Sequence, residues 1–368
     1  MRLTLLSLLV LLSCYGFSQT CTQRLKQAED DYEAGKLLGI PGQLESCLKA
    51  RDGFSKEEIV RARKLLTLVY IFTDQEARAE TAMIELLKAD AEHRLDPQVD
   101  PAELFFLYDQ FRTKPIFRIG LKFGTNVTFP SVIEEYGTFN VNNHQNFYNG
   151  KTTSGATEYT VGDGDEAETY SAISGLSLGL YGELLFEKEV KSGLEVVFGP
   201  QFRISTYSVD SYVNQETVNT TIQNDQTYLR APLAARYTLG AGDRDNKLLP
   251  YGFVGASFDY LITASSEGKL TGGRSYTLAS DNLKNTSQVR EFNYSVFGGI
   301  GVKIRNKTNF VTVEARYDKS LQNYVDGNNR YTNQEYVFDF AYVEPAIVLN
   351  LMSFSVGYTF SIYNPKKL

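Results

Sequence analysis

Residues 117–129 read FRIGLKFGTNVTF, and their side chains alternate between apolar and polar along the chain. Phenylalanine, isoleucine, leucine and valine occupy the odd positions, where Thr125 is the exception, and charged, amide, hydroxyl or glycine residues occupy the even positions. A period of two is typical of a β-strand that presents one apolar and one polar face. Residues 353–362 read SFSVGYTFSI and repeat the pattern. The sequence from residue 116 onward is therefore predicted to form strands.

Six segments between these two show the same alternation, which brings the predicted number of strands to eight. They lie at residues 172–186, 194–207, 228–239, 250–262, 292–305 and 310–320. The links alternate between long ones, at 130–171, 208–227, 263–290 and 321–351, and short ones, at 187–193, 240–249 and 306–309. This alternation is the pattern of outer-membrane β-barrels, whose short turns face the periplasm. We therefore predict the fold class α+β: an N-terminal α-helical domain followed by an eight-stranded antiparallel transmembrane β-barrel at residues 115–368.

The polar faces of these strands carry many charged side chains, which argues against a soluble β-sandwich or lipocalin-like barrel. Such a fold would have to enclose the large apolar face of every strand, and its interior would be overfilled. In a membrane barrel the charged face lines a narrow lumen, where opposite charges pair and are expected to form a plug. A narrow conduit or a catalytic pair of carboxylates is the alternative. The predicted lumen residues are Arg118, Lys122, Glu183, Glu195, Arg203, Arg230, Arg236, Asp259, Lys303, Glu314, Arg316 and Asp318.

The N-terminus has the composition of a secretory signal peptide at residues 1–18. A basic start precedes an apolar run at residues 3–12, and small Gly16 and Ser18 precede the expected cleavage point. The apolar run is too short to span a bilayer. Lipoprotein processing, which would attach lipid to Cys14, is the second possibility. Together with the barrel pattern, the leader predicts a Gram-negative outer-membrane protein whose N-terminal domain lies in the periplasm.

Residues 19–114 change to a helical period, and we predict an α-helical domain there. Leu65, Leu68, Val69 and Phe72 recur at spacings of three and four, which places them on one helix face. The domain resembles a pair of tetratricopeptide-like helical hairpins, and plain helical packing without a peptide-binding groove is the alternative. The residues that carry the resemblance are Ala28, Tyr32, Gly35, Ala62, Leu66, Tyr70, Ala79 and Leu86.

Two local features lie within this helical domain. Cys21 and Cys47 remain as a pair once the leader is removed, and an oxidising compartment permits a disulfide between them. The pairing stays open at this point, because simple antiparallel helices would not place the two residues level. Asp100 is placed as the N-cap of a short helix, with Pro101 at its first position and Glu103 completing a capping box.

Few residues point to chemistry. His93 and His144 lie outside the strand patterns, so a serine–histidine–acid triad is not predicted. Paired cysteines and histidines at zinc spacing are missing, and the acidic segment 163–166 lacks the ligand order of a calcium site. The net charge of −7, from 37 basic and 44 acidic residues, argues against nucleic acid as a partner. We therefore predict no catalytic residue, cofactor or metal, and a protein that is not an enzyme.

The barrel region resembles the PorT-like outer-membrane β-barrel family of Bacteroidota, because a series of short motifs occurs in the order typical of that family. They are FRTKPIFRIG at 111–120, YLRAPL at 228–233, PYGFVG at 250–255, GIGVK at 299–303, EARY at 314–317 and VGYTF at 356–360. The resemblance implies an integral outer-membrane protein, and some members of the family serve type IX secretion or gliding. The family has no common catalytic residues that the resemblance could assign to this chain. The chain differs from a family member that consists of the barrel alone, because a helical domain precedes its barrel.

The sequence thus favours a non-enzymatic outer-membrane barrel that anchors a periplasmic helical interaction domain. Its expected partners are outer-membrane lipid and another envelope or secretion protein, in a type IX or gliding assembly, which the helical domain would contact. A small-solute porin or transporter and an outer-membrane enzyme that modifies lipid or glycan are the two alternatives.

Overall fold

The chain folds into two compact units, residues 1–116 with 362–368 and residues 117–361. The fold is that of a computed structural model, which describes residues 21–134, 136, 160–161, 166–171, 178–213, 218–243, 245–271, 276–334, 336 and 342–368. Four features named above lie outside the described residues: the predicted leader at 1–18, Cys14, His144 and the acidic positions 163–165.

The first unit is a set of helices around one apolar core. A helix over residues 21–33 is followed by η1 (Leu37–Gly39), α2 (Ile40–Lys49), α3 (Lys56–Phe72), α4 (Glu76–Ala89) and α5 (Ala102–Tyr108). A capping box starts α3, because the Ser55 hydroxyl accepts the Glu58 N–H and the Glu58 carboxylate accepts the Ser55 N–H. The predicted helical character of this region is confirmed. Its fully buried residues include Leu25, Ala28, Ile40, Leu44, Ala62, Met83, Leu86, Leu87 and Leu104.

A disulfide joins the first helix of this unit to α2. Cys21 and Cys47 have Cα atoms 5.7 Å apart, within the range that bridged cysteines adopt. The bridge closes a loop of 26 residues. Loop-closure entropy for that length corresponds to about 3.5 kcal/mol of stabilisation relative to the reduced, unfolded chain.

The capping role predicted for Asp100 is wrong. The N-cap of α5 is Pro101, and no side chain caps this helix. The buried Asp100 carboxylate instead accepts the backbone N–H of Asp96 at 2.8 Å and forms an ion pair with Lys64 of α3 at 2.5 Å. The Asp100 carboxylate therefore pairs with Lys64 on a neighbouring helix, although the local sequence pattern predicted that it would cap the N-terminus of α5.

Residues 362–368, which the sequence-based range assigned to the barrel, belong to the helical unit. Leu368 N–H donates to the Gln110 carbonyl at 2.8 Å, and Arg112 N–H donates to the Lys366 carbonyl at 3.1 Å. The Tyr363 hydroxyl donates to the carboxylate of Glu92 at 2.7 Å. The C-terminal residues therefore pair with the segment that follows α5 through an isolated antiparallel bridge between Phe111 and Lys367.

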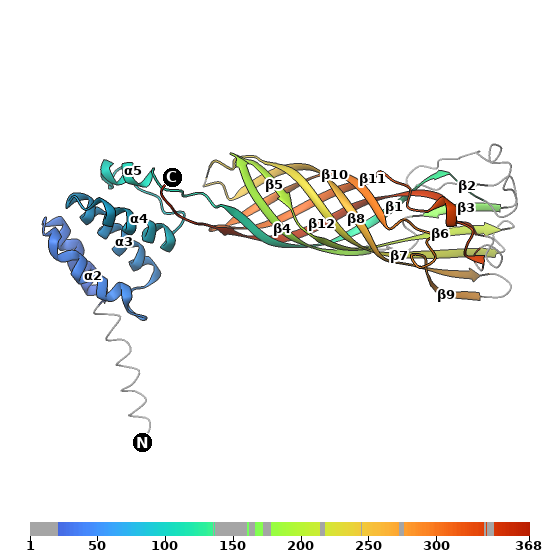
Figure 1. Cartoon of the computed structure of the whole chain (residues 1–368), viewed down its shortest axis with the longest axis horizontal. Coiled ribbons are helices and arrows are strands. Elements are labelled where there is room, and N and C mark those ends of the chain that lie inside the picture. The colour runs from blue at the N-terminus through green and yellow to red at the C-terminus, as the bar shows by residue number, and fades with distance from the viewer. Residues whose placement is uncertain are drawn as a thin grey trace, which may run out of the picture. The chain divides into compact units, whose positions relative to one another are not determined.

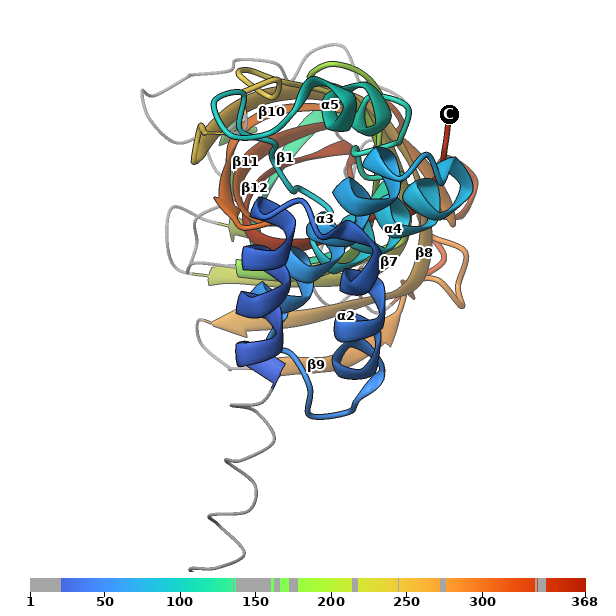
Figure 2. The same ribbon diagram turned by 90° about the vertical axis from the view of Figure 1, so that its left-hand side faces the viewer.

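The second unit is a closed antiparallel ring of strands, as Figures 1 and 2 show. Neighbours follow the order β1, β4, β5 with β6, β7, β8, β10, β11 and β12, and β12 pairs with β1 to complete the circle. Because β5 and β6 share one place, the described residues form eight strand positions. The predicted fold class is confirmed. The ring strands are β1 (Phe117–Glu134), β4 (Leu178–Lys191), β5 (Leu194–Phe198), β6 (Gln201–Val213), β7 (Val218–Thr238), β8 (Leu248–Thr271), β10 (Phe292–Asn306), β11 (Asn309–Ser320) and β12 (Ala346–Ile362).

Shorter elements extend the ring at its long-link end. β2 (Thr160–Val161) pairs with β3 (Glu166–Ser171), which pairs with β6, and β9 (Tyr276–Asn282) pairs with the last residues of β8. A short helix, η2 (Gly327–Asn329), lies between β11 and β12.

The break between β5 and β6 falls at Gly199 and Pro200. Proline has no N–H to donate to a neighbouring strand, so it interrupts the ladder. A Cβ at residue 199 would lie 1.7 Å from the carbonyl oxygen of Leu184, so only glycine fits there. The strand resumes at Gln201 and keeps its place between β4 and β7.

The outer surface of the barrel changes from apolar to polar at one level. On β8, Leu248, Val254 and Ile262 point outward and are exposed, whereas after a bulge the outward positions become polar, starting with Thr263 and Ser265. On β7 the outward residues change at the corresponding point, between Thr227 and Leu229. A band of apolar outward residues is the surface that a barrel presents to lipid. The strands therefore continue beyond this lipid-facing band at the long-link end.

No helix within the described residues is long and apolar enough to span a bilayer.

A charge on the lipid-facing band should destabilise the barrel far more than the same charge above it. Val254, which is 66% exposed, lies near the middle of the band on β8, and Ser265 lies above it on the same strand. We expect Val254→Arg to lower the free energy of unfolding by about 2–4 kcal/mol and Ser265→Arg by about 0–1 kcal/mol. Urea unfolding in lipid vesicles measures both. Equal losses at the two positions would contradict the assignment of the band.

Candidate functional site

The antiparallel register places opposite charges directly across from one another on the inner face of the ring. Residues directly opposite in such a pair have Cβ atoms roughly 4.5–5.5 Å apart, so their side chains meet in the lumen. The opposed charged pairs are Lys122–Glu183 between β1 and β4, Glu195–Arg236 between β5 and β7, and Arg230–Asp259 between β7 and β8.

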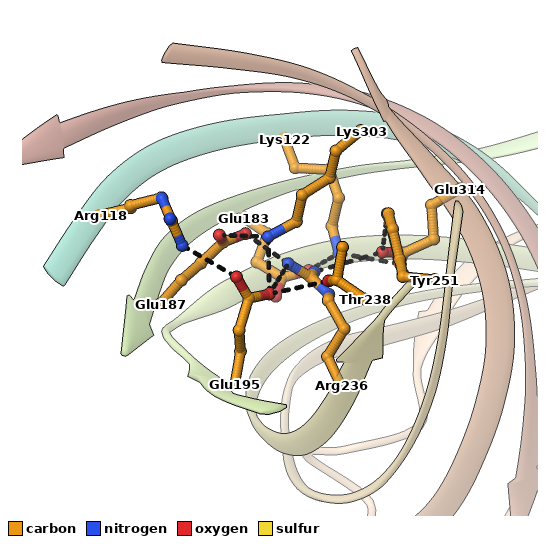
Figure 3. A network of polar contacts seen from close by, with 10 residues as sticks. All are labelled: Arg118, Lys122, Glu183, Glu187, Glu195, Arg236, Thr238, Tyr251, Lys303 and Glu314. Carbon is orange, nitrogen blue, oxygen red and sulfur yellow. Dashed lines mark hydrogen bonds and ion pairs between the residues drawn. The ribbon is translucent and has the colours of Figure 1, made fainter. Parts of the chain in front are cut away.

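Four cations and four glutamates form one connected network nearer the short-turn end, which we call the glutamate network (Figure 3). Lys303 of β10 reaches across the lumen to glutamates of β4 and β5, so the network joins separate parts of the ring. Its formal charges cancel. The N···O distances are 2.8 Å for Arg118–Glu195, 2.9 Å for Lys122–Glu183, 3.1 Å for Lys122–Glu314, 2.5 Å for Arg236–Glu187, 2.9 Å for Lys303–Glu187, 2.6 Å for Lys303–Glu195 and 3.7 Å for Arg236–Glu314, the pair that joins the Lys122 group to the rest.

Neutral side chains complete the hydrogen bonds of this network. The Tyr251 hydroxyl donates to Glu314 at 3.1 Å, and the Gln201 amide donates to Glu183 at 3.0 Å. Each of the four glutamates therefore has at least two partners. Charged groups withdrawn from water are stable when they are paired and hydrogen-bonded, and here every carboxylate is paired, while the Nε atoms of Arg118 and Arg236 have no partner within the described residues.

A second group, nearer the long-link end, is built on two aspartates, and we call it the aspartate network. Arg230 donates to Asp259 and to Asp318, both at 2.7 Å. Arg316 pairs with Asp318 at 2.6 Å, and its guanidinium carbon lies 3.5 Å from the centre of the Phe297 ring. Arg203 is buried beside this network but forms no ion pair in the described part of the chain.

The structure brings eleven of the twelve predicted lumen residues into these two networks, and Arg203 stands outside them. The sequence-based prediction missed Glu187, which is 1% exposed and pairs with both Arg236 and Lys303. It was placed in the turn after a strand ending at residue 186, whereas β4 continues to Lys191. The period-two series through Glu183 would have revealed it, because Glu187 continues the inward positions.

The segments that link strands cover the lumen at its other end, and we call this cover the cap. Tyr324 and Val325 are fully buried, and Tyr324 N–H donates to the Ile347 carbonyl at 2.8 Å. The Glu344 carboxylate accepts hydrogen bonds from Tyr207 at 2.8 Å and from Tyr342 at 3.0 Å. Tyr324, Val325, Tyr342 and Glu344 lie in a predicted long link that had no periodic signal, and the prediction assigned them no role. The apolar core of the cap comprises Tyr207, Ile222, Tyr228, Leu261, Ala264, Leu283, Val289, Tyr324, Val325, Tyr336, Tyr342, Ile347 and Leu349.

The described residues contain no cluster of three or more metal-ligating side chains. His93, in the helical unit, has its Nδ1 atom 3.4 Å from Asp90 and lies apart in sequence from every ring strand.

Comparison of the sequence with family models gives one match, to the outer membrane protein beta-barrel domain, over residues 109–326. The match covers more than half of the chain and includes strands β1 to β11 of the ring. The chain belongs to this outer-membrane β-barrel family. It is therefore an outer-membrane β-barrel protein whose apolar outer band contacts lipid. A comparison with curated proteins finds no match.

Several solved structures resemble this outer-membrane barrel at low sequence identity. Ail, the attachment invasion locus protein of Yersinia pestis, is 12% identical, with 67% of this chain and 99% of Ail covered and a TM-score of 0.26. OprG from Pseudomonas aeruginosa is 12% identical, with coverages of 67% and 97% and a TM-score of 0.34. The outer membrane protease OmpT from Escherichia coli is 10% identical, with coverages of 67% and 94% and a TM-score of 0.26. Likeness at this level concerns the fold alone.

Removing a cation of the glutamate network together with its partner should cost less than the sum of the two separate removals. Lys303→Met leaves Glu187 and Glu195 short of a counter-charge, and we expect a loss of about 3–5 kcal/mol in the free energy of unfolding. In the double variant Lys303→Met with Glu187→Gln the loss should be smaller than the sum of the single losses. A double-mutant cycle by urea unfolding measures this coupling. Additive losses would mean that the two side chains do not interact.

The cap should be less stable at alkaline pH because of Glu344, which lies in the link before β12, above the lipid-facing band. Burial raises the pKa of Glu344 above its ordinary value of 4.5, although hydrogen bonds from Tyr207 and Tyr342 and the charge of Arg330 oppose the shift. The folded cap therefore holds the proton more tightly than the unfolded one. Its stability is greatest below pH 4.5 and falls as pH rises through the raised pKa.

Hydrogen exchange of the Tyr324 and Asp326 amides, corrected for intrinsic rates, measures this pH effect. We expect weaker protection at pH 8 than at pH 5, and a reduced pH dependence in Glu344→Gln. Protection that falls to the same extent in that variant would assign the effect to another group.

Proposed function

We propose that the protein is a non-enzymatic anchor: its barrel holds the helical unit at the periplasmic face of the outer membrane, where that unit binds another envelope protein. The observation that carries this proposal is the charge-balanced glutamate network, whose ion pairs cross the lumen. The cap, in which the Tyr324 and Val325 side chains are buried, covers the lumen at the long-link end. Both features favour a plugged lumen and a function outside it.

The position of the short turns supports a periplasmic helical unit. The turns Ser192–Gly193 and Lys307–Thr308 lie at the end of the ring where β1 begins and β12 ends. Outer-membrane barrels keep their short turns in the periplasm. Because the helical unit is joined to the barrel at residues 116–117 and 361–362, the same rule supports a periplasmic location for it.

The surface of the helical unit supports an interaction role. Val99, just before α5, is 76% exposed, and Phe106, within α5, is 75% exposed. Leu38 in η1 is 87% exposed. Large apolar side chains left in water on a small unit are candidates for contact with a partner. The paired helices and the disulfide give that surface a rigid support. We place this partner in an envelope assembly, of which a type IX secretion or gliding apparatus is the candidate that the family resemblance implies.

The proposal predicts a crosslink from α5 in intact cells. A photoreactive amino acid in place of Phe106 should capture a specific envelope protein, whereas the same amino acid at Lys49, which is exposed on α2, should not. Phe106→Lys should reduce co-purification of that protein at least several-fold while the barrel keeps its heat-modifiable migration. Lys49→Ala is the matched surface control. A barrel that purifies without any specific partner under these conditions would overturn the proposal.

Conductance in planar bilayers distinguishes the porin alternative. A plugged lumen should give no stepwise conductance above background, and Lys303→Met with Arg236→Gln should increase leakage because both span the lumen. Large, stepwise conductance of the unaltered protein would establish a pore and would contradict the plug.

A further inference from the structure

Arg203 is a buried cation that forms no ion pair with any of the described residues. It points inward from β6, is 5% exposed, and its Nε and Nη1 atoms form no hydrogen bond within the described residues. Its guanidinium carbon lies 5.0 Å from the centre of the Tyr228 ring, and the negative face of the ring offsets part of the charge. An ion pair or a bound anion would normally complete such a buried cation.

The charges around Arg203 do not balance. The aspartate network and Arg203 together contain three guanidinium groups and two carboxylates. Both carboxylates are already engaged, since Asp259 accepts from Arg230 and Ser257, and Asp318 accepts from Arg230 and Arg316. One positive charge is therefore left in a part of the lumen that is withdrawn from water. The glutamate network, with four charges of each sign, cannot supply the missing negative charge.

A small cavity adjoins this unpaired guanidinium. It measures about 20 Å³, and its wall includes Arg203, Tyr228, Asp259, Asn293, Ser295 and Ser320. Asn293 is 6% exposed, and neither atom of its amide group forms a hydrogen bond in the part of the chain that is described. Guanidinium, amide and hydroxyl groups thus offer several donors, and the one carboxylate in the wall is held by Arg230.

We propose that this cavity binds one small monovalent anion of the halide class, chloride in most media, between the Arg203 guanidinium and the Asn293 amide. The cavity has room for at least one particle as large as water, and a monatomic ion such as chloride meets that requirement. A single negative charge also restores neutrality to the group of three guanidiniums and two carboxylates.

Bromide provides the direct test, because it replaces chloride and scatters X-rays anomalously. Crystals of the full chain grown in sodium bromide should show an anomalous peak within hydrogen-bond distance of the Arg203 guanidinium and the Asn293 amide. A cavity that contains only water in bromide would overturn the proposal.

Thermal unfolding in sodium chloride and in sodium gluconate, at equal ionic strength, provides the second measurement. The unaltered chain should unfold at a higher temperature in chloride, because a ligand that binds only the folded state stabilises it. Arg203→Gln removes the cation, and Asn293→Asp supplies a built-in carboxylate, so both variants should lose the chloride-specific shift. Lys319→Gln makes the same charge change on the outward face of β11 and should keep it. A shift retained in both lumen variants would mean that chloride acts elsewhere.

Discussion

The hydrocarbon core of a membrane offers no hydrogen-bond partners to a peptide backbone, so strands that cross it must form a closed ring. In this protein the ladder between β7 and β8 runs from Asn219–Thr271 to Thr238–Tyr251, and β12 returns to β1. Closure sends every second side chain into a lumen too narrow to leave charged groups in bulk water. The charged side chains inside the barrel must therefore pair with one another, because the backbone can satisfy its hydrogen bonds in the membrane only as a closed ring.

The alternation of side chains allowed the strands and their inner faces to be predicted, because in a β-strand the sequence position determines the face directly. Glu187 was missed because the predicted strand ended at residue 186, although the same alternation continues to Glu187 and β4 runs to Lys191. Two further features depended on relations between distant segments that no local pattern contains. The isolation of Arg203 depends on the stagger between strands, and the disulfide from Cys21 depends on how two helices lie side by side.

The lumen divides into two chemical environments. The glutamate network is fully paired, whereas the region between it and the cap holds buried amides and hydroxyls without partners among the described residues, such as Asn224, Gln226 and Ser205. Buried polar groups of this kind are normally hydrated. One end of the barrel is thus tightly packed with ion pairs, and the other is a polar chamber under the cap.

Residues 362–368 tie the fold of the helical unit to a segment that follows the barrel. The helices precede the barrel in sequence, yet residues 366–368, which pair with residues 110–112, are synthesised after every described barrel strand. The helical unit therefore gains its last backbone pairing only when translation has passed the whole barrel. A chain interrupted within the barrel would lack the hydrogen bonds that Gln110 and Arg112 form with Leu368 and Lys366.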